Sequence, residues 1–93
     1  MHIVWSDLAK ANLKEIYNYY KEVASVRVAK SITNKIIKKP GALTKQPELG
    51  QTEENPTVLG RGFRYLVEGN YKIVYKVYSG NDEILIAAVF DTR

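Results

Sequence analysis

The chain has 93 residues, 45% of them hydrophobic, and its 14 Lys and Arg residues against 10 Asp and Glu give a net charge of +4. This length allows a single domain, which we place over residues 1–93, and the absence of cysteine excludes disulfides and thiolate sites. The single histidine, the lack of an apolar run long enough to span a membrane and the lack of a secretory signal predict a cytoplasmic protein without a metal site or cofactor.

The first half of the chain predicts a short strand followed by two helices. Residues 2–5 are a strand candidate too brief to stand alone, so we expect this strand to pair within a sheet. Ser6 can cap a helix that begins at Asp7, and Ser25 can cap a second one that ends near Lys39, because the residue before a proline avoids the helical region. Apolar residues recur at helical spacing after each cap: Ala9, Leu13, Ile16, Tyr17 and Tyr20, then Ala29, Ile32 and Ile36. The short connection predicts an antiparallel helical hairpin.

The second predicted helix lies in a segment without acids. Between Val23 and Pro47 the charged residues are all basic: Arg27, Lys30, Lys35, Lys38, Lys39 and Lys45. Such a segment is either a solvated helix face or a surface for a polyanion or an acidic partner segment.

The second half of the chain predicts a loop and three strands. Residues 44–56 contain prolines, a glycine and little apolar content, which is typical of a loop. Two alternating runs, 58–68 and 71–78, flank Gly69-Asn70, a pair that tolerates the positive φ of a two-residue primed turn. The apolar run 84–90 predicts an inner strand that is covered on both faces. We therefore expect an α+β fold of order β-α-α-β-β-β, with the helical hairpin on one face of a small, mainly antiparallel sheet.

Segments spread over essentially the whole chain resemble the RelE/ParE superfamily, the toxins of type II toxin–antitoxin (plasmid-stabilisation) modules. The matching residues are Trp5, Ala9, Leu13, Ile16 and Tyr20, then Pro47-Glu48-Leu49-Gly50, Arg64-Tyr65-Leu66, Tyr71-Lys72-Ile73-Val74-Tyr75, Ile84-Leu85-Ile86-Ala87-Ala88-Val89 and Phe90-Asp91-Thr92-Arg93. The resemblance implies a small basic toxin that arrests growth and is neutralised by an acidic antitoxin encoded beside it. Such a toxin reaches operator DNA only through the antitoxin. We expect the antitoxin to cover a sheet edge and the groove next to the helices, because exposed strand edges accept added strands.

The superfamily contains two mechanisms. RelE-like members enter the ribosomal decoding site and cut messenger RNA, whereas ParE-like members bind DNA gyrase and poison it. Fold alone does not choose between them, because function depends on the site.

Arginines are the residues here that favour RNA cleavage. Cleavage without a metal uses the RNA 2′-hydroxyl as nucleophile and needs a base, an acid and cations that stabilise the charged phosphorane, a role that suits arginine. Arg64 matches the arginine that RelE-like toxins carry at the start of their second strand. Arg61 lies nearby and Arg93 follows the last strand, so all three could converge on one edge of the sheet. The alternative is that they are surface arginines that anchor Glu68, Asp91 or the antitoxin.

The base for such a reaction is missing from its usual place. Several RelE-like toxins end their last strand with a His-Tyr pair or a catalytic tyrosine, where this chain has Thr92-Arg93. The loop offers Glu53 and Glu54 instead of the lysines of some relatives, and Glu54 is the candidate base.

By a small margin we favour a ribosome-dependent mRNA endonuclease that uses Arg61, Arg64 and Glu54. Expected binding residues are Asp91, Arg93, Lys35, Lys38 and Lys39. The alternative is a ParE-like gyrase inhibitor, for which the missing base is harmless because binding needs none. A further alternative is an inactive toxin that serves as antitoxin ligand and co-repressor.

Overall fold

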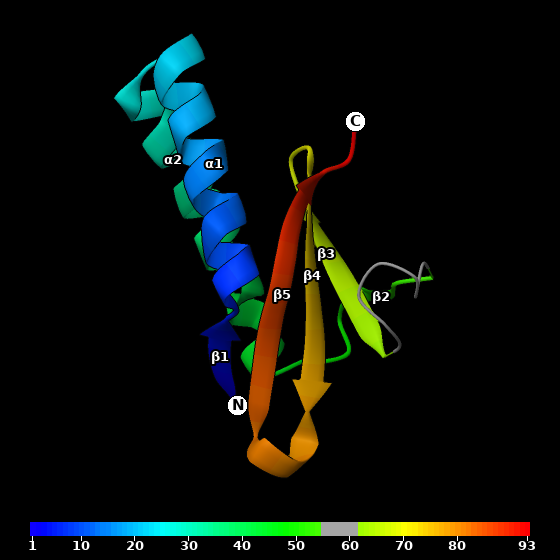
Figure 1. Cartoon of the computed structure of the whole chain (residues 1–93). Coiled ribbons are helices and arrows are strands. Elements are labelled where there is room, and N and C mark those ends of the chain that lie inside the picture. The colour runs from blue at the N-terminus through cyan, green and yellow to red at the C-terminus, as the bar shows by residue number, and fades with distance from the viewer. Residues whose placement is uncertain (55–61) are drawn as a thin grey trace.

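Two helices pack against one face of a five-stranded sheet in the computed structural model of the chain, which describes residues 1–54 and 62–93 (Figure 1). In chain order the elements are β1 (His2–Trp5), α1 (Asp7–Val23), α2 (Val26–Lys38), the 3₁₀ helix η1 (Lys39–Thr44), β2 (Gln51–Thr52), β3 (Phe63–Glu68), β4 (Tyr71–Tyr78), the 3₁₀ helix η2 (Ser79–Asn81) and β5 (Glu83–Asp91). The strand order is β1-β5-β4-β3-β2, in which β1 runs parallel to β5 and the other neighbours are antiparallel. The predicted α+β class and the helical hairpin are confirmed.

Both predicted helix caps are present, and the first also joins α1 to the sheet. The Oγ of Ser6 accepts a hydrogen bond from the N–H of Ala9 (3.0 Å) and donates one to the carbonyl of Ala87 on β5 (2.8 Å). The Oγ of Ser25 accepts from the N–H of Val28 (3.1 Å), at an exposed position. Ser6 therefore fixes where α1 begins relative to β5, whereas Ser25 serves only its own helix.

Strand β5 carries a β-bulge. The pairing registers on its two sides differ by one residue and leave Ala87 without a partner on β4. As a result Ile84 and Ile86 before the bulge and Val89 after it all belong to the core between the sheet and the helices. Ala87 belongs to a smaller apolar cluster on the other face of the sheet. The strand is thus buried on both faces, as predicted. The N–H of Val89 donates to Oδ1 of Asn12 on α1 (3.0 Å), a second tie between this helix and β5.

The hairpin of β3 and β4 turns at Gly69-Asn70, as predicted. Gly69 has a φ of 59°, whereas the φ of Asn70 is not positive. A positive φ at the first central residue alone is the pattern of a type II′ turn. β3 begins at Phe63, and residues 58–61 of the predicted run lie outside the described part of the chain.

Two short elements were not predicted. α2 ends at Lys38, close to the expected end, but η1 then continues the helical path with Pro40 in its first turn, a position that proline tolerates. Within residues 44–56, which we expected to be loop, β2 pairs with β3, so that Thr52 lies opposite Arg64. The order of elements is therefore the predicted one with a two-residue edge strand added.

Replacing Ser6 by alanine should destabilise the fold more than replacing Ser25. Ser6→Ala removes a cap and leaves the Ala87 carbonyl without its side-chain partner, at a cost of about 2–3 kcal/mol in the free energy of unfolding. Ser25→Ala removes only an exposed cap, at a cost of about 1 kcal/mol. Urea denaturation followed by circular dichroism measures both values. Equal losses would mean that the bond from Ser6 to β5 contributes nothing to stability.

Candidate functional site

Arg64 and Tyr75, which face each other across β3 and β4, hold the loop that precedes β2. Nη1 of Arg64 donates to the carbonyl of Gly50 (2.9 Å) and lies 3.5 Å from that of Glu48. The Tyr75 hydroxyl donates to the carbonyl of Pro47 (2.9 Å) and accepts from the N–H of Gly50 (2.9 Å). We call these two side chains the loop clamp. Their hydrogen bonds tie the Pro47-Glu48-Leu49-Gly50 segment to the sheet.

Gly50 is required by the close approach of the loop to the clamp. A Cβ at this position would lie 2.6 Å from both the Tyr65 carbonyl oxygen and the Tyr75 hydroxyl oxygen. Burial raises the pKa of the Tyr75 phenol, although the Gly50 N–H and the nearby Arg64 act in the opposite direction. The phenol therefore remains a protonated hydrogen-bond donor at neutral pH.

The candidate catalytic residues are not assembled into a site in the described part of the chain. Arg64 is half-buried, and its described acceptors are backbone carbonyls. Glu54 is exposed, while Glu53 beside it forms an ion pair with Lys72 (3.1 Å). The third candidate, Arg61, lies outside the described residues. Arg64 is thus built into the fold as a loop anchor, with further guanidinium N–H groups that these two contacts do not use.

The expectation that Arg64 and Arg93 converge on one edge was wrong. In the meander of β3, β4 and β5 the first and third strands run in the same direction, so the start of β3 and the end of β5 lie at opposite ends of the sheet (Figure 1). Arg64 pairs with Tyr75, whereas Asp91 pairs with Tyr71, four residues along β4, or about 13 Å.

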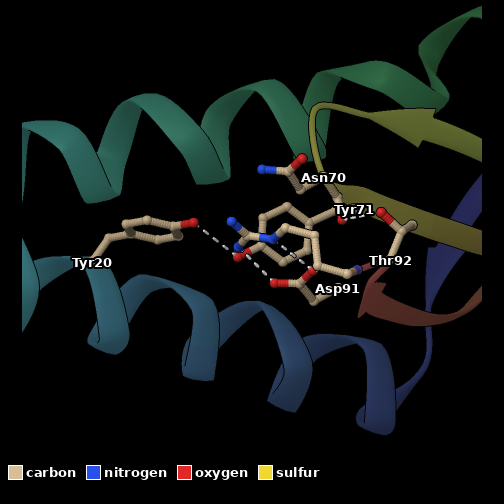
Figure 2. Close-up of polar contacts among 6 residues, drawn as sticks. Tyr20, Asn70, Tyr71, Asp91 and Thr92 are labelled. Atoms are coloured by element: carbon tan, nitrogen blue, oxygen red, sulfur yellow. Dashed lines mark hydrogen bonds and ion pairs between the residues drawn. The ribbon is translucent and has the colours of Figure 1, made fainter.

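Arg93 instead anchors Asp91, one of the roles considered from the sequence. Its Nη2 lies 2.8 Å from Oδ2 of Asp91, and both its Nε (3.1 Å) and its backbone N–H (2.8 Å) donate to Oδ1. These hydrogen bonds lower the pKa of the Asp91 carboxyl to about 2. Next to this pair the N–H and hydroxyl of Thr92 donate to the carbonyl of Asn70 (2.7 and 3.0 Å), which ties the end of β5 to the β3–β4 turn (Figure 2).

Two tyrosines that the sequence assigned to apolar faces meet beside this tail. The Tyr71 hydroxyl donates to that of Tyr20 (3.3 Å), between the sheet and α1 (Figure 2). Burial, followed by the hydrogen bond to Tyr20, raises the pKa of Tyr71, so this phenol also stays protonated at neutral pH. The repeated tyrosines were visible in the sequence, but the pairing depends on the strand register.

Open concavities lie on both sides of Tyr71, and together we call them the tyrosine groove. One has a volume of about 220 Å³ and is lined by Asn12, Glu15, Ile16, Tyr71, Val89 and Asp91. The other has a volume of about 170 Å³ and is lined by Tyr20, Ile32, Lys35, Ile36, Glu68, Gly69, Asn70 and Tyr71. The groove thus brings together Lys35, Asp91 and, through its ion pair, Arg93. Lys38 and Lys39 are exposed farther along the helical segment and do not line it.

None of the helices within residues 1–54 and 62–93 is long and apolar enough to cross a membrane. The same residues contain no group of three or more His, Cys, Asp or Glu side chains that could hold a metal ion.

Comparison with known proteins gives consistent matches. The model of a family described as the ParE toxin of the type II toxin–antitoxin system parDE matches residues 3–93. The fold is similar to a structure of the chromosomal ParDE system from P. aeruginosa, with a TM-score of 0.80, 21% identity, and coverage of 100% of this chain and 97% of that one. It is also similar to the toxin–antitoxin complex RelBE2 from Mycobacterium tuberculosis, with a TM-score of 0.64, 14% identity, and coverage of 97% and 88%. No curated protein sequence matches significantly.

Replacing Gly50 by alanine should cost about 3 kcal/mol in the free energy of unfolding, since the new methyl group collides with Tyr65 and Tyr75 inside a packed loop. Gly41→Ala is the matched control, because a Cβ there has no atom within 4 Å, and it should change stability by less than about 1 kcal/mol. Thermal denaturation distinguishes the two. A Gly50→Ala protein as stable as the parent would show that the loop is not held by the clamp in solution.

The ion pair of Asp91 should be visible in its titration. We expect an Asp91 pKa of about 2 in the folded protein, against an ordinary value of 3.8, and a return toward 3.8 in Arg93→Ala. The lowered folded-state pKa means that the contribution of the pair to stability is present above about pH 4 and is lost as the pH falls toward 2. Carboxyl ¹³C NMR measures this titration, with Lys45→Ala as a distant control. An Asp91 pKa near 3.8 in the parent protein would mean that the pair does not form.

Proposed function

Because the chain belongs to the ParE toxin family of type II toxin–antitoxin systems, we propose that it arrests growth by binding DNA gyrase rather than by cutting RNA. The chain is the toxin of such a module, and the mechanism is what we propose. The sequence alone slightly favoured RNA cleavage. We now favour the gyrase mechanism, and the loop clamp and the similarity to the ParDE structure support this choice.

The loop clamp is the observation that carries this proposal. Cleavage requires an arginine directed at the phosphorane and a group that accepts the proton of the 2′-hydroxyl. Arg64 is directed instead at the carbonyl of Gly50, and the neighbouring phenol of Tyr75 is protonated and already uses its hydroxyl as both donor and acceptor. Thr92 and Arg93, which replace the His-Tyr pair, bond to Asn70 and Asp91 at the other end of the sheet. A toxin that acts by binding needs none of these groups to be reactive.

An acidic antitoxin segment is the proposed occupant of the tyrosine groove. The groove combines apolar floor residues such as Ile16 and Ile36 with Lys35, and Asp91, which lines it, forms an ion pair with Arg93. The two similar structures both come from toxin–antitoxin systems. The outer strands β1 and β2 offer sheet edges to which such a segment could add a strand.

Ribosome-dependent RNA cleavage is the second candidate. It is favoured by the acid-free helix α2 and by the guanidinium N–H groups of Arg64 that its two loop contacts leave available. In this mechanism Arg64 would bind phosphate, with Arg61 beside it and Glu54 as the base.

Induction of the chain without a partner in a bacterium separates the mechanisms, when DNA and protein synthesis are followed by pulse labelling. We expect DNA synthesis to stop first, with a DNA-damage response, and the purified chain to inhibit supercoiling by gyrase. If protein synthesis stops first and primer extension finds cut messages, the RelE-like mechanism is correct. If the protein is soluble and neither synthesis stops, the result would support the alternative of an inactive toxin that serves as antitoxin ligand.

Arg64→Ala is the control that distinguishes an anchor from a catalytic residue. As an anchor, its loss should cost about 1–3 kcal/mol of stability and reduce toxicity only in proportion to the folded fraction. A folded Arg64→Ala protein, verified by circular dichroism, that has lost all toxicity would instead support a direct role in cleavage.

A further inference from the structure

The helical hairpin has a second concavity, on the side of the α1–α2 seam that does not contact the sheet. It has a volume of about 250 Å³ and is lined by Lys10, Leu13, Lys14, Tyr17, Thr33 and Ile37, so both helices contribute and no strand does. The tyrosine groove uses other residues of the same helices. We call this second concavity the outer seam.

The floor of the outer seam is apolar and accessible. Leu13 and Tyr17 are half-buried, and Ile37 is 46% exposed. The Thr33 hydroxyl bonds to the carbonyl of Ala29 within its own helix (2.9 Å), so it needs no further partner from a ligand. The floor therefore favours apolar side chains, which gain from leaving water, over a purely ionic ligand.

The rim of the outer seam is positively charged. Lys10 and Lys14 line it directly, and helical spacing places Lys21 four residues beyond Tyr17 and Lys30 three residues before Thr33 on the same face. In the described part of the chain no ion pair is formed by any of these four lysines.

Two of the three acids of α1 lie elsewhere. Glu15 lines the tyrosine groove, and Glu22 follows it at seven residues and so lies on the same side of the helix. Asp7, in the first turn, precedes Lys10 by three residues and Lys14 by seven, so it lies on the side of the rim. α2 contains no acid. On this face Asp7 therefore stands against four lysines, and the rim keeps a net positive charge.

We propose that the outer seam binds an amphipathic helix of a protein partner, with apolar residues in the concavity and acidic residues against the lysine rim. A second copy of this chain is disfavoured because it would bring two lysine rims together. Duplex DNA would use the charges but would leave Leu13, Tyr17 and Ile37 uncovered. A helix laid in a groove uses both features. Since this surface is separate from the tyrosine groove, the toxin can hold two partner segments at once.

A synthetic helix tests the proposal directly. The probe carries a fluorescein label, leucines at i, i+3, i+4 and i+7, and glutamates beside them, and its binding to the full chain is followed by fluorescence anisotropy. We expect saturable binding that is at least about tenfold weaker for Lys14→Glu and for Ile37→Ser, a change equivalent to about 1.4 kcal/mol. A probe with lysines in place of the glutamates should not bind.

The controls are matched in type and exposure. Lys45→Glu changes an exposed lysine outside the seam, and Leu49→Ser changes a side chain that is 51% exposed, close to the 46% of Ile37. Both should bind the probe within about twofold of the parent. Equal losses in seam and control variants, or no saturable binding by folded parent protein, would overturn the proposal. Tighter binding of a short DNA duplex, with the same sensitivity to Lys14→Glu but none to Ile37→Ser, would identify a nucleic-acid surface instead.

Discussion

The structure depends on how β5 is held in the sheet. This strand pairs with β1 on one side and β4 on the other, and its bulge at Ala87 switches which residues face the helices. Two hydrogen bonds join helix α1 to the strand at the bulge. Ser6 donates to the carbonyl of Ala87, and Asn12 accepts from the N–H of Val89. The strand thereby sets the start and direction of α1. The position of α1 in turn brings Tyr20 to Tyr71 and forms the tyrosine groove.

The loop clamp shows how a residue that resembles a catalytic group can serve the fold. Arg64 matches an arginine of RelE-like toxins, and Tyr75 belongs to a segment that resembles the RelE/ParE superfamily, yet their polar atoms bond to Pro47 and Gly50. An arginine or tyrosine whose side chain bonds to backbone groups cannot be removed without leaving those groups unpaired, so the presence of such a residue does not require a catalytic role. The binding function that we propose depends on surfaces instead, and the helical hairpin offers one on each side of its seam.

The features that were predicted correctly are those encoded locally. The serine caps, the helical spacing of apolar residues and the Gly69-Asn70 turn each depend on residues within a few positions of one another. The two-residue β2 exists only because it pairs with β3, and an uninterrupted apolar run such as 84–90 gives no alternation from which a bulge could be located. The partners of Arg64 are 14 and 16 residues away in a loop, so its anchoring role was invisible to sequence patterns. The distance between Arg64 and Arg93 could have been predicted, because in a meander the first and third strands run in the same direction, which puts the start of β3 and the end of β5 at opposite ends of the sheet.

The parallel pairing of the first strand with the last described one has a consequence for biosynthesis. The bond from Ser6 to Ala87 spans 81 positions, and β1 has no other neighbour in the sheet among the described residues. Contacts this distant in sequence form late, because the intervening chain must be ordered first. A nascent chain on the ribosome lacks β5 until residues 83–91 have been made, and without this strand α1 has nothing to dock on. The tyrosine groove, which Val89 and Asp91 help to line, therefore cannot form before β5 has left the ribosomal tunnel.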